Sequence, residues 1–124
     1  NSNTMSDKIK SVEDLIVYQK SVELFNAFIE EDLPVLKNDS AGRMLYGNQL
    51  RCLDSICANM EEGFERKGGK EIKYFFRMSK GSSGEARGRY KRLKFVLKED
   101  LILKRVNLLS EIRAMLDSLI RKWE

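Results

Sequence analysis

The chain has 124 residues, 42% hydrophobic and 34% charged, with a formal net charge of +4. A chain of this length forms one domain that buries about two-thirds of the surface its unfolded form exposes. The single proline and the scarcity of β-branched runs argue against sandwiches and barrels, so an all-α fold is expected. The apolar runs are far shorter than the roughly 20 residues of a membrane span, and no segment resembles a secretory signal, so a cytoplasmic location is expected.

The sequence contains no histidine, which removes the commonest general base and the commonest metal ligand. Di-iron sites in helical bundles also use Glu-x-x-His pairs. Cys52 and Cys57 are five residues apart, about 140° around a helix, which suits neither a disulfide nor a shared metal. We therefore predict two reduced cysteines, no cofactor, no metal and no enzymatic activity.

The N-terminal third is predicted to hold a disordered segment and one helix. Residues 1–11 are polar and aperiodic, and a single four-helix domain is expected over 12–124. A capping motif at Ser11 to Asp14 precedes a helix over about 12–32, which Pro34 is expected to end. Its predicted core positions are Leu15, Tyr18, Val22, Phe25 and Ile29. Residues 34–44 are predicted to form a loop.

Three further helices are predicted from apolar residues at alternating spacings of three and four. The helix over about 44–66 carries Tyr46, Leu50, Leu53, Cys57, Met60 and Phe64. The helix over about 70–98 carries Ile72, Phe76, Ser79, Ser83, Ala86, Tyr90, Leu93 and Leu97. The helix over about 104–123 carries Leu109, Ile112, Leu116, Leu119 and Trp123. Four such helices joined by short loops predict an antiparallel up-down four-helix bundle with left-handed packing.

The third predicted helix contains a Gly-Ser-Ser-Gly stretch at 81–84, which raises the alternative of a helix-turn-helix. Each interior glycine costs roughly 1 kcal/mol relative to alanine. A turn would be free to reset the apolar phase, yet the phase continues across the stretch without a slip. One continuous helix is therefore the favoured interpretation.

Positive charge is concentrated in this same helix. Between Arg66 and Lys98 the chain holds twelve lysine or arginine residues and two acids, whereas the remainder holds eleven basic and seventeen acidic residues. Nine of the cations recur at helical spacing, displaced by one residue from the apolar stripe. They are Arg66, Lys70, Lys73, Arg77, Lys80, Arg87, Lys91, Lys94 and Lys98. A row of cations attracts a polyanion because each neutralised phosphate releases counterions. We therefore predict that the eight cations from Lys70 to Lys98 bind nucleic acid, RNA more readily than DNA.

Other interpretations of the stripe stay open. A long exposed helix can carry many cations on a merely solvated face, although such faces usually mix charges of both signs. The stripe could also meet the acidic surface of another copy of the chain or of an acidic partner. Gly81, Gly84 and Gly88 form a bare strip beside it, which suits close approach of a second helix or of a nucleic-acid backbone. Membrane binding is the weakest alternative, because the apolar faces are used by the bundle.

Two smaller groups of residues have ordinary structural interpretations. Glu62 and Arg66 are four apart and predict an ion pair, and Asn59 is expected to hydrogen-bond a loop or a neighbouring helix. Tyr74 and Phe75 are candidates for stacking on bases.

Four stretches of the chain occur in the order and spacing of a known family. They are Asp14-Leu-Ile-Val-Tyr-Gln-Lys20, Ser55-Ile-Cys-Ala-Asn-Met-Glu-Glu-Gly-Phe-Glu-Arg66, Lys80-Gly-Ser-Ser-Gly-Glu85 and Met115-Leu-Asp-Ser-Leu-Ile120. They resemble the 23S rRNA intervening-sequence proteins and their relatives, the bacterial accessory variability proteins of diversity-generating retroelements. The resemblance spans roughly residues 12–123. Cys57 stands where the family usually has proline, and Glu61 where it usually has alanine.

The resemblance implies a four-helix bundle that assembles into a homopentamer with a basic, nucleic-acid-binding surface. In the retroelement branch it also implies contact with a reverse transcriptase. The leading hypothesis from the sequence is a non-enzymatic protein that contacts phosphates of structured RNA without reading bases. The alternative is an oligomeric adaptor whose basic stripe docks on an acidic protein, such as a polymerase.

Overall fold

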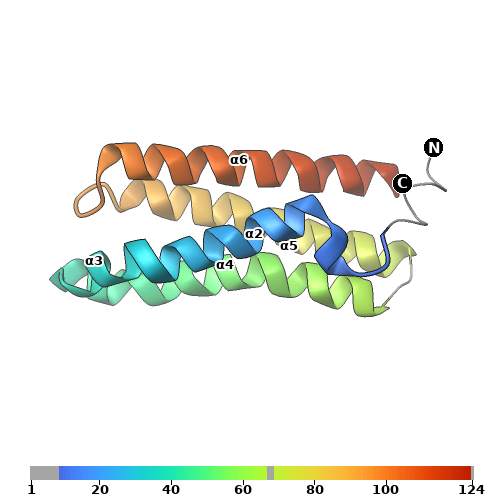
Figure 1. Cartoon of the computed structure of the whole chain (residues 1–124), viewed down its shortest axis with the longest axis horizontal. Coiled ribbons are helices and arrows are strands. Elements are labelled where there is room, and N and C mark those ends of the chain that lie inside the picture. The colour runs from blue at the N-terminus through green and yellow to red at the C-terminus, as the bar shows by residue number, and fades with distance from the viewer. Residues whose placement is uncertain (1–8, 67–68, 124) are drawn as a thin grey trace.

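The computed structural model of the chain describes residues 9–66 and 69–123. A short 3₁₀ helix, η1 (Val12–Asp14), leads into α2 (Ile16–Ala27), which continues through the π-helical turn η2 (Phe28–Asp32) into α3 (Leu33–Lys37). The long helices α4 (Ser40–Arg66), α5 (Gly69–Arg92) and α6 (Glu99–Lys122) follow. Neighbouring helices run antiparallel, and α2 contacts both α4 and α6, so the ring of helices closes (Figure 1). The predicted all-α four-helix bundle is confirmed.

The first helix does not end before Pro34, as the sequence analysis expected. The chain stays helical to Lys37, and a π-helical turn precedes the proline, in which the amide of Leu33 donates to the carbonyl of Phe28. Proline lacks an N–H, and its ring clashes with the carbonyl four residues earlier in a regular helix. A wider turn relieves both problems, so the proline causes a bulge here and no helix end.

The core stripe of α2 is displaced from the predicted one. Its buried residues are Val17, Ser21 and Leu24, continued by Phe28, whereas Ile29 is 37% exposed. Leu15 is buried as predicted, but its backbone is extended and it precedes the helix. Of the other predicted core positions, Tyr18 and Phe25 are partly buried and pack against the core, so the predicted stripe lies at the edge of the buried face.

Residues 9–11 are packed against the bundle, although they fall in the segment predicted to be disordered. Ile9 contacts the core, and the amides of Lys10 and Ser11 donate to Asp14 Oδ2 at 2.8 and 3.1 Å. These hydrogen bonds lower the pKa of Asp14. The predicted capping motif is therefore present, and the prediction for residues 1–8 lies outside the described residues.

The connection between α3 and α4 is only two residues long, where an eleven-residue loop was predicted. Asp39 Oδ2 accepts a hydrogen bond of 2.8 Å from the amide of Gly42 and so caps the start of α4. A Cβ atom at Gly42 would lie well inside van der Waals contact with the backbone of Leu36. The glycine that suggested a loop is thus a buried residue of α4 that permits a tight turn.

Helix α5 runs without interruption through residues 81–84, so the prediction of one continuous helix is confirmed. It ends at Arg92, six residues earlier than predicted, and the amides of Val96 and Leu97 both donate to the carbonyl of Leu93 in a compact turn. Leu93 and Leu97 are both buried by this turn, which satisfies the apolar pattern without a helix. Helix α6 begins at Glu99, where two acids in the first turn favour the helix N-terminus.

A buried polar cluster fastens the first, third and fourth long segments together. Asp32, which is fully buried, accepts hydrogen bonds from Tyr90 Oη at 2.6 Å and from Arg105 Nε and Nη2 at 3.0 Å each. Arg105 also donates to Glu31 at 2.9 Å. Burial lowers the pKa of Arg105, but its hydrogen bonds with the two carboxylates outweigh that effect and raise it. The cluster fixes the bulged turn at the end of the first helix against α5 and α6.

Candidate nucleic-acid interface

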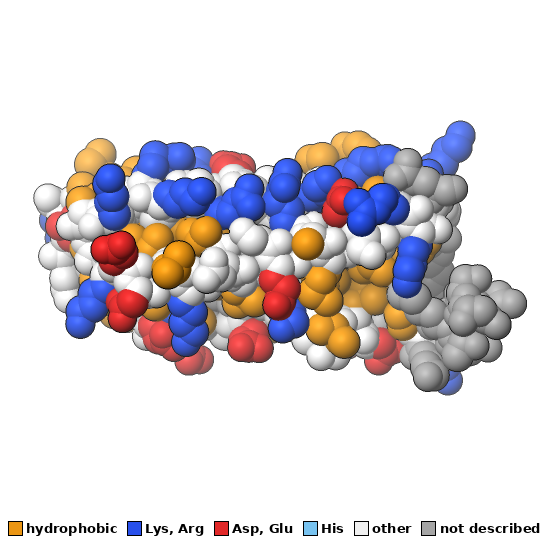
Figure 2. Space-filling view, turned by 90° about the horizontal axis from the view of Figure 1, so that it is seen from above, with side chains coloured by type: hydrophobic (Ala, Val, Ile, Leu, Met, Phe, Trp, Pro, Cys, Tyr) orange, Lys and Arg blue, Asp and Glu red, His pale blue; other side chains and the backbone are white. Residues whose placement is uncertain are grey.

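Two of the cations predicted on α5 contact α6 across the groove between the two helices. Lys80 Nζ is 2.7 Å from Asp117 Oδ1, and Arg87 Nη1 donates to Ser110 Oγ at 3.1 Å. The core positions of α5, such as Phe76, Ser83 and Tyr90, are buried on the adjacent face. Figure 2 shows a row of lysine and arginine side chains along one edge of this side of the bundle, with acidic side chains more frequent toward the other edge.

Two arginines of α6 that were not predicted as site residues join this row. Arg113 lies against Gly84, and Arg121 Nη1 contacts Asp117 Oδ2. The signal was the spacing of Arg113, Asp117 and Arg121, four residues apart, which places them on one face of a helix. We define the basic seam as these two arginines together with the cations of α5 whose helical spacing puts them on the same stripe as Lys80 and Arg87. Its members are Lys70, Lys73, Arg77, Lys80, Arg87, Lys91, Arg113 and Arg121.

Lys94 and Lys98 were predicted to continue the row on the same helix, and the structure places them elsewhere. Because α5 ends at Arg92, Lys94 lies in the following turn and Lys98 is the N-cap residue of α6. Both are exposed. The seam is therefore shorter than the row that the sequence suggested, but two helices contribute to it.

Asp117 is the acid that contacts the seam. It interacts with Lys80 and Arg121, and its pKa is lowered chiefly by the hydrogen bond from Lys80, with the charge of Arg121 adding to it. Asp117 stays ionised under ordinary conditions and neutralises part of the positive charge at this point. The charge of Arg113 also acts on Asp117 and lowers its pKa.

The three glycines of the bare strip have different surroundings. At Gly84 an added Cβ would lie 3.3 Å from Arg113 Nε, and at Gly88 it would lie 3.5 Å from Arg92 Nη1 of the same helix. At Gly81 nothing lies within 4 Å. Of the three, only Gly84 receives a side chain from a neighbouring helix.

A sequence model of the 23S rRNA-intervening sequence proteins matches residues 13–118. This chain belongs to that family. The match runs from η1 into the last turns of α6 and so includes all four helices and most of the basic seam. Comparisons with curated proteins and with solved structures gave no significant match.

In this 23S rRNA-intervening sequence protein, the family-like motifs of α4 and α5 meet each other on the opposite side of α5 from the seam. Ser55 Oγ and Ser82 Oγ are 2.9 Å apart, and Asn59 Nδ2 donates to Ser55 Oγ at 2.9 Å. Among the described residues, Asn59 thus bonds within its own helix, whereas a bond to a loop or a neighbouring helix was predicted. The predicted ion pair of Glu62 and Arg66 is confirmed at 2.8 Å. These motif contacts join two helices, so they serve packing.

Glu61, one of the two departures from the usual family residues, contacts α2. It accepts a hydrogen bond of 2.7 Å from Tyr18 Oη. The pKa of Tyr18 is raised by burial and by this carboxylate. Cys57, the other departure, is a buried free thiol like Cys52. Burial, with the charges of Glu61 and Asp54, raises the pKa of Cys57 to about 12.

Aromatic residues occupy the end of α5 next to the seam. Tyr74 is 56% exposed, and its ring is 5.0 Å from that of Phe75 in an edge-to-face arrangement. The guanidinium of Arg66 lies 5.5 Å from the Phe75 ring centroid. Base stacking by this pair stays a prediction.

Across residues 9–66 and 69–123, no helix combines the length and the apolar composition that a membrane span requires. No three acidic or cysteine side chains in them are grouped so that they could hold a metal ion.

Proposed function

We propose that this 23S rRNA-intervening sequence protein is a non-enzymatic nucleic-acid-binding protein that holds structured RNA, and DNA more weakly, along the basic seam. The observation that carries the proposal is the row of cations along α5, joined at the groove between α5 and α6 by Arg113 and Arg121 of α6. The family name associates its members with ribosomal RNA, which favours RNA as the ligand.

The seam suits phosphates better than bases. From Lys70 to Lys91 it extends about 32 Å along α5, at 1.5 Å per residue, which is enough to meet several successive phosphates. Lysine and arginine contacts to phosphate position a nucleic acid but carry no sequence information. Binding along the seam is therefore expected to be tolerant of sequence and strongly dependent on salt.

The test is a filter-binding titration with an end-labelled RNA hairpin and its DNA equivalent over a series of salt concentrations. The variant with Lys73, Arg77, Arg87 and Lys91 all replaced by glutamine should bind at least about tenfold more weakly, with a salt slope reduced by about three. A matched control replaces four cations outside the seam, Lys10, Lys37, Arg43 and Arg51, and so loses the same charge. Equal losses in both variants, or no binding by the wild type at low salt, contradict the proposal.

We also propose that the protein assembles with copies of itself, as a pentamer according to the family resemblance, and acts in the cytoplasm. The exposed face of the first helix supports self-association because it carries Glu23 of α2 and Glu30 of η2, which are complementary in charge to the basic seam. Light scattering of the purified protein measures the mass of the assembly. A monomeric mass at physiological salt contradicts this part of the proposal.

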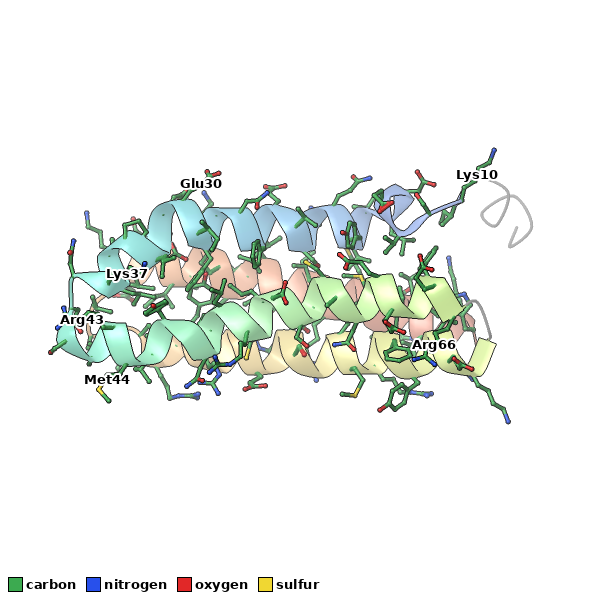
Figure 3. The ribbon with its side chains drawn as sticks, turned by 90° about the horizontal axis from the view of Figure 1, so that it is seen from below. Lys10, Glu30, Lys37, Arg43, Met44 and Arg66 are labelled. Carbon is green, nitrogen blue, oxygen red and sulfur yellow. The ribbon has the colours of Figure 1, made fainter. Side chains whose placement is uncertain are left out.

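A second candidate function is that of an oligomeric adaptor for an acidic protein such as a reverse transcriptase or another polymerase. The observation that favours it is a set of exposed apolar side chains at the end of the bundle where α3 meets α4 and α5 turns into α6. Met44 is 82% exposed there, and Phe95 is 51% exposed. Figure 3 shows Met44 beside Lys37 and Arg43 at this end. Capture of a polymerase that survives nuclease treatment supports the adaptor, and its loss on that treatment favours the nucleic-acid proposal.

A further inference from the structure

The middle of the basic seam is built differently from its flanks. The contacts Lys80 with Asp117, Gly84 with Arg113 and Arg87 with Ser110 follow one another in antiparallel order. The two flanking cations therefore have partners on α6. At the central position the cation itself comes from α6, and α5 presents a glycine to it.

The side chain of Arg113 packs closely against Gly84. A Cβ atom at position 84 would lie 3.3 Å from Arg113 Nε and 3.9 Å from its Cδ, so a larger residue there would displace the guanidinium by a few tenths of an ångström. Gly84 lies within a helix, where glycine is less favourable than alanine by roughly 1 kcal/mol. The helix thus keeps a residue that weakens it at the point where Arg113 crosses.

The guanidinium of Arg113 has an unused hydrogen-bond donor. Arg113 Nε is buried and has no hydrogen-bond partner among residues 9–66 and 69–123, while the residue as a whole is only half-buried. A buried donor without an acceptor carries a free-energy cost, and an arriving anion can remove that cost by supplying the acceptor. The guanidinium also offers several N–H groups in a fixed plane, which matches the oxygens of a phosphate.

We propose that Arg113 is the central phosphate ligand of the basic seam and that Gly84 is the positioning residue that gives it its place. This inference rests on the proposed function, because the phosphate belongs to the backbone of the bound nucleic acid. When the guanidinium of Arg113 moves slightly outward from Gly84, its N–H groups can donate hydrogen bonds to the phosphate oxygens. Lys80 and Arg87 then neutralise the phosphates on either side.

The first experiment compares three substitutions in the full chain, using the same RNA hairpin over the same salt series. Arg113→Gln should weaken binding about tenfold and reduce the salt slope by about one. Arg113→Lys keeps the charge, so the slope should stay unchanged while the loss of the planar fork still weakens binding about threefold. The matched control is Arg51→Gln, which removes an exposed cation of α4 that lies outside the seam and should change binding by less than about twofold.

The second experiment separates the positioning role of Gly84 from a merely structural one. Gly84→Ala and Gly81→Ala make the same chemical change three residues apart in one helix, but only the first adds a methyl group against Arg113. Both should keep or raise the thermal midpoint, because alanine favours the helix. Gly84→Ala should nevertheless weaken RNA binding about three- to fivefold, as expected for a misplaced phosphate ligand, whereas Gly81→Ala should leave it unchanged.

The outcomes distinguish this inference from the function on which it rests. If the wild type binds and the fourfold seam variant does not, but Arg113→Gln binds within twofold of the wild type, the inference alone is overturned. Equal RNA binding by Gly84→Ala and Gly81→Ala overturns the proposal that Gly84 positions Arg113. Absence of any salt-dependent binding by the wild type overturns both proposals.

Discussion

The buried cluster of Asp32, Tyr90 and Arg105 makes a quantitative prediction about stability. Asp32 is fully buried, and Arg105, at 3% exposure, is its only cationic partner among the described residues. Replacing Arg105 by methionine keeps most of its length and apolar packing but leaves a buried carboxylate without a counter-charge. The hydrogen bond from Tyr90 at 2.6 Å remains.

The expected magnitudes follow from the chemistry of buried charges. Removal of one partner of a buried ion pair costs about 3–5 kcal/mol, which is a large share of the 5–15 kcal/mol that stabilises a typical domain. Tyr90→Phe removes one hydrogen bond to a charged acceptor and should cost about 1.5–3 kcal/mol. The triple variant Asp32→Leu, Tyr90→Phe and Arg105→Met removes every polar atom of the trio, so it should be more stable than Arg105→Met alone. Glu31 has an exposed side chain, and its contact with Arg105 adds little.

Urea unfolding followed by circular dichroism measures all of these variants, provided that the slope with denaturant stays constant across the series. Far-ultraviolet spectra before unfolding show whether each variant retains its helices. A cost below about 1 kcal/mol for Arg105→Met would refute the reasoning, since it would mean that water or a rearranged side chain satisfies Asp32. A triple variant less stable than the single one would also refute it.

Three further predictions concern single positions. Asp117→Asn should tighten RNA binding about two- to fivefold, because it releases Lys80 and Arg121. The control Asp54→Asn makes the same charge change on the exposed surface of α4 and should leave RNA binding unchanged. Filter binding measures both variants. Gly42→Ala should lower the free energy of unfolding by more than about 2 kcal/mol through its clash with backbone, while Gly47→Ala, with only Arg51 Nη1 at 3.8 Å, should keep or raise it in the same urea assay. Burial raises the pKa of the Cys57 thiol to about 12, so Cys57 should react with iodoacetamide at pH 8.5 far more slowly in the native protein than in urea. Mass spectrometry measures the two rates of alkylation. Equal rates would contradict the burial of Cys57.

Residue patterns predicted most of the architecture because they reflect local chemistry. The apolar phase through residues 81–84 indicated a continuous α5, and the buried positions from Phe76 to Leu97 match it. Turn residues misled where their local preference was overridden. Pro34 was expected to end a helix, and Gly42 to lie in a loop, but a widened turn and a close helix crossing accommodate them within helices.

Only the α5 part of the candidate site could be predicted from the sequence. The cations of α5 were visible because they recur at helical spacing along one segment. Arg113 and Arg121 lie in a segment with mixed charges, so nothing local marks them as part of the same surface. Their membership depends on the rotation of α6 about its own axis, which is set by the burial of Leu109, Ile112 and Leu116.

The sequence by itself determined that this chain is a bundle of amphipathic helices with its positive charge concentrated on one of them, since periodicity and composition act over neighbouring residues. Only the tertiary structure decided which second helix faces that charge. It also decided that Asp117 neutralises part of that charge and that Arg113 of α6 packs against Gly84 of α5. Those relations join residues about thirty apart in the chain, and packing of the apolar stripes establishes them.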